Sequence, residues 1–447
     1  MAAVYSTDLS IYIAETFRNS LDTSNVYLTF GYSTPWTYEL EPDGANTSVD
    51  SVNETWKYMI GGKRILAKDV HHVIPRRDWV AGYVYDAYDN ITDSLYQHGY
   101  WTSMYVITDD LNVYKCISNN PDQYGYGQPS LYKPSSTNPA SQFQTADQYV
   151  WKYMYSLTGE EQIKFLTDGF IPVKTLTGDN NSLQWQVQED AVAGSIHDIR
   201  LNPFGGEGIG YTQNNISVII TGDGRYANAY VVRDYANDTI SRIIVDNKGS
   251  GYTYANVSFK SSTGTGASAY AIISPPGGHG SDALHELGGS YLMINVDLNG
   301  TEGGILDTKN DYRQVAIIAN PKILNDSNTM SNLVFSQVTV LTLAPSSTST
   351  DYVKDELVYQ GAANNFTFKG IVTSWDSANS LLKLTNVEGS PTSDLIVGNT
   401  STAARYVNST LDPDCQPYSG YLLYKDNITA IERADDQIDD FKLVLRF

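Results

Sequence analysis

GEGIGYTQNNISVIITGDGRYANAYVV, residues 206–232, recurs in outline as NKGSGYTYANVSFKSSTGTGASAYAII, residues 247–273. Gly210-Tyr211-Thr212 returns as Gly251-Tyr252-Thr253, 41 residues later. Each copy runs from a glycine-rich turn into an alternating strand, then through a second glycine turn into an alanine-rich strand. Alternation is typical of half-buried strands, and glycine adopts the positive φ angles that tight turns need. Two copies are too few for a solenoid, so the repeat predicts a small β-module with internal pseudo-symmetry.

The same strand-and-turn pattern extends outward over most of the chain. Short helices are predicted at residues 8–22 and 53–68. Strands are predicted at NVYLTFG (25–31), in a hairpin over 100–120 that turns at Asp109-Asp110, at YVWKYMYSLT (149–158), at YRQVAIIANPKIL (312–324), at 355–360, 366–374, 380–387 and 394–408, and at 441–447. The predicted fold class is therefore mainly β with a few short helices (α+β), and multi-domain.

Changes in composition predict a frame that carries two inserted modules. Glycine becomes dense near residue 194, and a Ser/Thr-rich linker, APSSTSTDYV, begins at residue 344. We expect a β-sandwich- or barrel-like frame with two small β-modules inserted in it. The predicted boundaries are a frame domain at 1–190, a Gly-rich repeat module at 191–285, a return to the frame at 286–345, a small barrel-like module at 346–417 and a C-terminal frame segment at 418–447.

Composition and charge exclude several classes of protein. The 447 residues are 41% hydrophobic and 18% charged, which is enough apolar surface to fold and too little charge for a disordered chain. The net charge of −21 and the lack of a long Lys/Arg run argue against nucleic acid as a partner. Cys116 and Cys415 form neither a disulfide scaffold nor a zinc motif. We also expect no signal peptide and no membrane span.

HHVIPRRDW, residues 71–79, has the crowded polar composition of an active site. Adjacent histidines on an extended segment point to opposite faces, however, and no zinc-like spacing of ligands lies nearby. We instead predict a strand-to-turn element, stiffened by proline, in which an arginine pairs with an acid such as Asp78 and the apolar residues pack in a core or interface. The predicted structural or interface residues are Ile74, Pro75, Arg76, Arg77, Asp78, Trp79, Trp36 and Trp151.

Other tempting motifs carry little chemistry, so no catalytic residue, cofactor or metal is predicted. GGEGIG (205–210) precedes a strand-like stretch, although a dinucleotide loop must open a helix. His279 lies in a Gly/Pro loop without a nucleophile motif, and RADDQIDDF (433–441) lacks the spacing of a calcium loop. Four tyrosines of the repeat, Tyr226, Tyr230, Tyr252 and Tyr254, are interpreted as filling strand faces, the alternative being that they stack on sugar rings.

Several long strings resemble a known family. VYLTFGYSTPW, MIGGKRILAKDVHHVIPRRDW, VYKCIS and DQYVWKYMYSL, followed by YRQVAIIANP and the ending SGYLLYKDN…IERADDQIDDFKLVLRF, stand in the order of similar strings in the baseplate wedge subunit of T-even (T4-like) contractile-tailed phages, the product of gene eight. The resemblance covers about the first 160 residues, 305–325, and 418 to the C-terminus. The Gly-rich repeat and the barrel-like module depart from the family pattern.

The resemblance implies a non-enzymatic structural protein of the virion tail baseplate, assembled in the host cytoplasm. Family members dimerise and bridge other wedge proteins and fibre-attachment proteins during baseplate assembly and its change of shape on infection. A tyrosine-rich chain without a cofactor suits such interfaces. One alternative is a glycan-binding tail or fibre protein that recognises the host surface, and a second is a polysaccharide-degrading tail enzyme.

Overall fold

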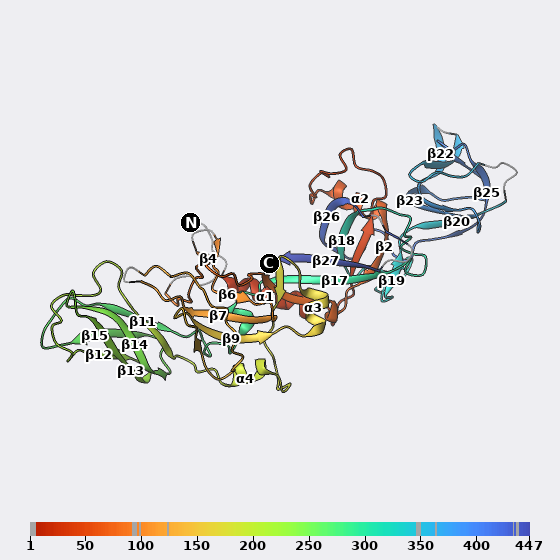
Figure 1. Cartoon of the computed structure of the whole chain (residues 1–447). Helices are drawn as coiled ribbons and strands as arrows, with labels where there is room; N and C mark the ends of the chain where they lie inside the picture. The colour runs from red at the N-terminus through yellow and green to blue at the C-terminus, as the bar shows by residue number, and fades with distance from the viewer. Residues whose placement is uncertain are drawn as a thin grey trace. The chain divides into compact units, whose positions relative to one another are not determined.

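The computed structural model describes residues 6–91, 96–97, 100–122, 125–345, 350–362, 364–431, 433–434 and 438–447 (Figure 1). Strands dominate these residues, and the helices are few and short, so the predicted fold class is confirmed. The chain forms two compact units and passes between them several times. The first unit is Met1–Ala14, His71–Met293 and Leu445–Phe447, and the second is Glu15–Val70 and Ile294–Val444.

A sheet buried on both faces forms the centre of the first unit. Its strands, in the order β6-β7-β9-β8, are β6 (Tyr105–Ile107), β7 (Asn112–Ser118), β9 (Val150–Ser156) and β8 (Phe143–Gln144). Strands β6 and β7 form the predicted hairpin. Tyr105 and Ile107 contribute to one hydrophobic cluster, and Val106, between them, contributes to another. The period of two along the strand therefore supplies apolar side chains to both faces.

Short elements surround this sheet. Three helices begin at side-chain N-caps, namely Thr158, Ser182 and Asp282, which accept hydrogen bonds from the first turn. The elements are α1 (Thr7–Ser20), which continues into the second unit, β3 (Val70–Pro75), β10 (Phe170–Pro172), α3 (Gly159–Phe165), α4 (Leu183–Glu189), α5 (Ala283–Glu286), and the short pair β4 (Tyr96–Gln97) and β5 (Tyr100–Trp101). The helix predicted at 8–22 is thus confirmed.

The Gly-rich repeat folds as a β-module within the first unit. A four-stranded sheet has the order β11-β16-β15-β12, and β13 pairs with β14 in a separate hairpin. The strands are β11 (Ile196–Leu201), β12 (Ser217–Gly222), β13 (Arg225–Asp234), β14 (Thr239–Ser250), β15 (Ala255–Lys260) and β16 (Ala269–Ile273). They appear as the green strands of Figure 1.

The two copies of the repeat pack against each other reciprocally. Their alternating strands, β12 and β15, pair antiparallel, with Ser217 opposite Lys260. A Cβ on Gly224, in the first copy, would come within 2.3 Å of the ring of Tyr252, in the second. A Cβ on Gly264, in the second copy, would come within 2.5 Å of the ring of Tyr211, in the first. Each tyrosine is buried under a glycine of the other copy, as internal pseudo-symmetry predicts.

The second unit contains a five-stranded sheet and a closed barrel. The sheet has the order β19-β2-β1-β18-β26, with β19 (Val334–Ser336), β2 (Met59–Arg64), β1 (Val26–Gly31), β18 (Tyr312–Ala319) and β26 (Tyr421–Ile431). Every residue of β1 and β18 is buried, including the polar residues Thr29, Arg313 and Gln314. The 3₁₀ helix η1 (Ala67–Asp69) follows β2, and β17 (Tyr291–Asn299) and β27 (Ile438–Arg446) each contain residues of both units.

The predicted helix at 53–68 is wrong in its second half. Helix α2 (Val49–Tyr58) ends at Tyr58, and β2 follows immediately. Gly61 and Gly62 let this strand lie close to the neighbouring strand β19. A Cβ on Gly62 would come within 2.5 Å of the Phe335 ring, so a larger residue would not fit there. The close approach of a neighbouring strand therefore decides the conformation at these glycines, and helical periodicity does not.

The barrel has the strand order β20-β23-β22-β21-β24-β25 and closes on itself. Its strands are β20 (Thr339–Leu343), β23 (Leu381–Gly389), β22 (Asn365–Asp376), β21 (Leu357–Ala362), β24 (Leu395–Gly398) and β25 (Ala404–Leu411). The single strand predicted at 394–408 is wrong, because Thr402, at positive φ, lies in a turn that separates β24 from β25. Closure leaves no unpaired sheet edge in the barrel.

Candidate functional site

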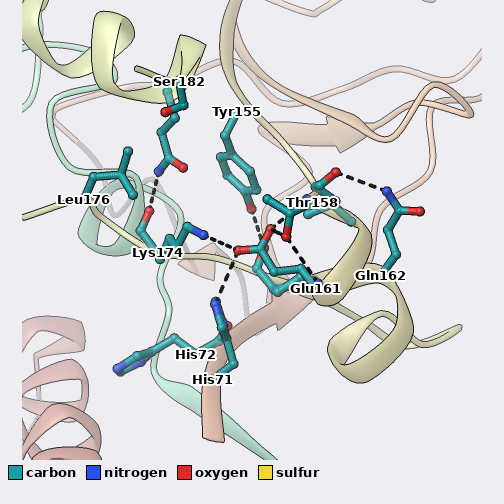
Figure 2. Close-up of polar contacts among 12 residues, drawn as sticks. His71, His72, Tyr155, Thr158, Glu161, Gln162, Lys174, Leu176 and Ser182 are labelled. Carbon is teal, nitrogen blue, oxygen red and sulfur yellow. Dashed lines mark hydrogen bonds and ion pairs between the residues drawn. The ribbon is translucent and has the colours of Figure 1, made fainter. Parts of the chain in front are cut away.

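The two histidines of HHVIPRRDW point away from each other, as predicted, and do not form a joint site (Figure 2). The Nε2 atom of His71 lies 3.5 Å from Oε1 of Glu161, and its Nδ1 lies 2.8 Å from the carbonyl oxygen of His72. The buried His72 instead places Nδ1 2.8 Å from the carbonyl oxygen of Gly289. Each imidazole is therefore attached to a different segment of the first unit.

The rest of the segment is fastened to strand β6. Ile74 is fully buried in a hydrophobic cluster, and the carbonyl oxygen of Pro75 accepts a hydrogen bond from the Tyr105 hydroxyl at 2.7 Å. The amide of Ile107 donates to the carbonyl of Arg77 at 2.7 Å, and the amide of Trp79 donates to the carbonyl of Ile107 at 2.9 Å. The segment thus extends β3 past its proline as an ordered part of the frame.

Arg76 and Asp78 form the arginine–acid pair that the sequence predicts. The Arg76 Nε donates to both carboxylate oxygens at 3.1 and 3.0 Å, and Nη2 donates to Oδ1 at 2.9 Å. Nη1 of Arg76 donates to the carbonyl of Thr167 at 3.1 Å. Both side chains face solvent in part, which limits the contribution of the pair to stability. An interface role for Arg76, Arg77 and Asp78 stays a prediction.

The predicted tryptophans occupy three different environments. Trp151 is fully buried and stacks on Tyr149, with ring centroids 5.5 Å apart. Trp79 packs at the margin of the same cluster and donates through Nε1 to the Ser130 hydroxyl at 3.2 Å. Trp36 belongs to the second unit, where it stacks on Tyr32 at 4.1 Å and donates to the carbonyl of Ile428 at 2.9 Å. Their shared feature is aromatic packing.

A polar centre that the sequence did not reveal surrounds Glu161 (Figure 2). Its Oε2 accepts from the amide and the hydroxyl of Thr158, both at 2.8 Å, in a capping box at the start of α3. Its Oε1 accepts from Lys174 at 2.6 Å and faces His71. Burial raises the pKa of the Glu161 carboxyl, but hydrogen bonds from His71, Lys174 and Thr158 outweigh it and hold the pKa well below its usual range. The TGEE string that begins at Thr158 was the available sequence signal.

A second buried centre joins three separated segments of the first unit. Lys115 and Glu286 form an ion pair of 2.7 Å whose side chains are 0% and 3% exposed. The Lys115 ammonium lies 4.3 Å above the ring of Tyr88, and Oε1 of Glu286 accepts from the amide of Gly280 at 2.7 Å. Burial lowers the pKa of Lys115, although Glu286 opposes the shift. No motif predicts this pair, because its members stand 171 residues apart.

Two neutral histidines adjoin the ion pair. The Nε2 atom of His279 lies 3.0 Å from Nδ1 of His197, so one ring donates a hydrogen bond and the other accepts it. Burial, together with nearby cations that include Lys115, lowers the pKa of both imidazoles well below the usual value. His279 is therefore a core residue and not an exposed base. This agrees with the expectation that its Gly/Pro loop carries no catalytic residue.

The chemistry of these centres is structural. Within the described ranges, no three His, Cys, Asp or Glu side chains are arranged to hold a metal ion. Residues 205–210 form turns in which Gly208 and Gly210 have positive φ, and strand β12 follows them. In RADDQIDDF, Arg433 pairs with Asp439, while residues 435–437 lie outside the described residues.

Of the four repeat tyrosines interpreted as filling strand faces, Tyr226 and Tyr230 lie on strand β13, whereas Tyr252 and Tyr254 lie in the connection between β14 and β15. Tyr252 is buried, at 6% exposure, beneath Gly224. Tyr226, Tyr230 and Tyr254 are instead 72%, 51% and 56% exposed. The physical reason for the first two is that β13 pairs with β14 alone in a two-stranded sheet, so that side chains on one of its faces meet solvent. Alternation located the strands but did not reveal which faces are covered.

Comparisons with known proteins point to one family. Residues 2–124 match the family model described as Bacteriophage T4, Gp8. The chain is also 27% identical to the baseplate wedge protein gp8 of Enterobacteria phage T4 over 229 residues, which cover 42% of this chain and 66% of that protein. The chain thus spans somewhat less than two thirds of this relative. No helix in the described ranges has both the length and the apolar character needed to span a membrane. The resemblance to the T4-like gp8 family is therefore confirmed, and residues 2–124, which include HHVIPRRDW, carry the family match.

Proposed function

We propose that this chain is a structural subunit of a phage tail baseplate, located in the wedge. The observation that carries the proposal is the match of residues 2–124 to the gp8 family, in a chain whose tempting motifs prove to be packing elements. The two polar centres support the same conclusion, because they tie distant segments together around buried carboxylates. The chain acts through protein contacts and not through catalysis.

An exposed patch next to the family motif offers a surface for such contacts. We define the Tyr83 patch as Val80, Tyr83, Val84, Leu131 and Tyr132, which are 43–60% exposed. The amide of Gly82 donates to the carbonyl of Ser130 at 2.6 Å, and the amide of Ser130 donates to the carbonyl of Tyr83 at 2.8 Å, so the two segments lie side by side. Tyrosines such as Tyr83 and Tyr132 belong to the residue types that are enriched at protein interfaces.

The finer part of the proposal concerns partners. We infer that the subunit forms a homodimer, bridges neighbouring wedge and fibre-attachment proteins and moves with them during the baseplate switch. The net charge of −21 supports partners that carry complementary basic surfaces. The Tyr83 patch is the surface proposed for one of these contacts, because it continues directly from the ordered 74–79 segment.

The test is complementation of a phage that lacks this gene. We expect the Tyr83→Ser/Leu131→Ser double variant to fold normally but to leave baseplates incomplete in electron micrographs. A control, Phe204→Ser/Tyr226→Ser, removes even more exposed apolar groups from the Gly-rich module. Complete tails without the subunit would overturn the wedge role. Normal tails with the Tyr83-patch variant would overturn only the assignment of that surface.

A further inference from the structure

A pocket of about 780 Å³ in the first unit is not used by the structural role. Its walls come from the end of β7 and the turn after it, from the segment before β9, and from strands β11 and β14. The frame therefore supplies one wall and the Gly-rich module supplies the other. The volume lies in the range typical of small-molecule sites, roughly 300–1,000 Å³.

Planar polar side chains dominate the pocket, and their own hydrogen bonds hold them in place. The side-chain amide of Asn119 donates to the carbonyl of Tyr85 at 2.9 Å, which leaves its side-chain oxygen available. Arg242 donates to Oε1 of Gln148 at 3.2 Å, and both residues are exposed at the pocket. Amide and guanidinium groups of this kind present donors and acceptors in one plane, which suits pairs of adjacent hydroxyl groups.

One residue of the pocket lining carries a buried polar atom without a partner. His197 lines the pocket and is 9% exposed. Its Nδ1 is bonded to His279, but its buried Nε2 has no hydrogen-bond partner among the described residues. A buried polar atom without a partner is uncommon in folded proteins, but this one is closed to solvent, so it does not contact a ligand in the pocket.

Charge and apolar surface narrow the ligand class. Arg200 forms an ion pair with Asp198 at 3.0 Å, so this pair leaves little net charge for an ionic ligand. Asp86, Asp89 and Asp122 add further carboxylates to the lining, which disfavours phosphate and acidic sugars. Tyr270, which is partly exposed, supplies apolar surface against which the C–H face of a sugar ring packs.

We propose that this pocket binds a neutral oligosaccharide. The volume of the pocket accommodates an oligosaccharide of about two or three sugar rings. Arg242 and Gln148 bond adjacent hydroxyls, Asn119 accepts from another, and Tyr270 packs against a ring face. The site is independent of the wedge contacts proposed above, because its residues lie outside the Tyr83 patch.

The experiment uses the full chain on a broad glycan array, followed by saturation-transfer NMR with the neutral array hits and with chitotriose and maltotriose. We expect at least one neutral oligosaccharide to bind with a dissociation constant of about 0.1–1 mM. The Arg242→Ala/Gln148→Ala variant should bind at least about tenfold more weakly, because two hydrogen-bonding groups are lost. Both residues are exposed, so the fold should be retained.

The control variant, Arg225→Ala/Gln213→Ala, removes the same side-chain types from exposed positions of the module outside the pocket. It should bind like the unaltered chain. Absence of binding to every neutral glycan at millimolar concentration overturns the proposal. So does equal binding by the pocket variant, or a defect of that variant confined to tail assembly, which would identify a peptide segment of a neighbouring protein as the occupant.

Discussion

Two ion pairs of the first unit differ in almost everything but their charges. Arg76 and Asp78 are two residues apart and have side chains that are 24% and 53% exposed. Lys115 and Glu286 are 171 residues apart and have side chains that are 0% and 3% exposed. The first pair is visible in the sequence and makes a forked contact, whereas the second is invisible there and joins distant segments.

The difference shows that an ion pair recognisable from the sequence need not contribute more to the free energy of unfolding than one that only the structure reveals. An exposed pair gains little because water screens both charges, and measured contributions are about 0–1 kcal/mol. Removing one partner of a buried pair leaves an uncompensated charge in a medium of low dielectric constant and costs about 3–5 kcal/mol. The four substitutions below test whether the loss of stability increases with the burial of the charged or polar group that is changed.

The largest effect is expected for Lys115→Met. The variant leaves the Glu286 carboxylate buried without its cation, so we expect the free energy of unfolding to fall by about 3–5 kcal/mol. Urea denaturation followed by circular dichroism measures it. The double variant Lys115→Met/Glu286→Gln should recover part of the loss, because no buried charge remains. A loss below about 1 kcal/mol for Lys115→Met would contradict the comparison.

The buried histidines should make the first unit sensitive to acid. Their folded-state pKa values are lowered, so the unfolded chain binds more protons as the pH falls below about 6.5. Stability is therefore fully present above that pH and should decrease below it by up to about 1.4 kcal/mol per histidine for each pH unit. Unfolding midpoints measured from pH 7.5 to 5.5 test this. His279→Gln keeps a polar group toward His197 and should flatten the profile, and an unchanged profile would exclude His279 as a source.

An intermediate effect is expected for Glu161→Gln. The amide keeps an oxygen for Thr158 but loses the charge that faces His71 and Lys174, so we expect a loss of about 1–2 kcal/mol at pH 7. Because the folded pKa of Glu161 is depressed, its contribution is present above the ordinary value of 4.5 and disappears as the pH falls below it. The variant and the unaltered chain should therefore converge in acid, and a constant difference down to pH 3 would contradict this assignment.

The smallest effect is expected for Asp78→Asn. The Arg76 side chain retains its bond to the Thr167 carbonyl and its access to water. The free energy of unfolding, measured by thermal denaturation, should therefore change by less than about 1 kcal/mol. A loss as large as that of Lys115→Met would remove the distinction between the two pairs. Addition of salt should reduce even this small difference, since the pair is exposed.

Local patterns predicted much of the fold. The hairpin over 100–120, the buried strand of residues 312–319 and the reciprocal repeat all follow from alternation, apolar runs and glycine turns. Prediction failed where the conformation or the exposure of a residue depends on a packing neighbour that is distant in the sequence. The Phe335 ring against Gly62 makes residues 59–64 a strand, and the lack of a covering layer exposes Tyr226.

The candidate site shows the same division. The strings that include HHVIPRRDW indicated the family, and the pairing of Arg76 with Asp78 was foreseen because the two residues are close in the chain. The Glu161 centre was missed, although its capping box was readable, because nothing local relates it to His71 or Lys174. Packing brought those residues together.

The amino-acid sequence alone determined that this chain is rich in strands, acidic, internally repeated and similar to a phage baseplate family, because alternation, composition and ordered motifs are local properties of a chain. Only the tertiary structure decided that Lys115 meets Glu286, that His197 meets His279, and that a polar pocket opens where the repeat module meets the frame. Burial and electrostatics depend on which segments pack together, and segments separated by eighty residues or more leave no local trace of that pairing.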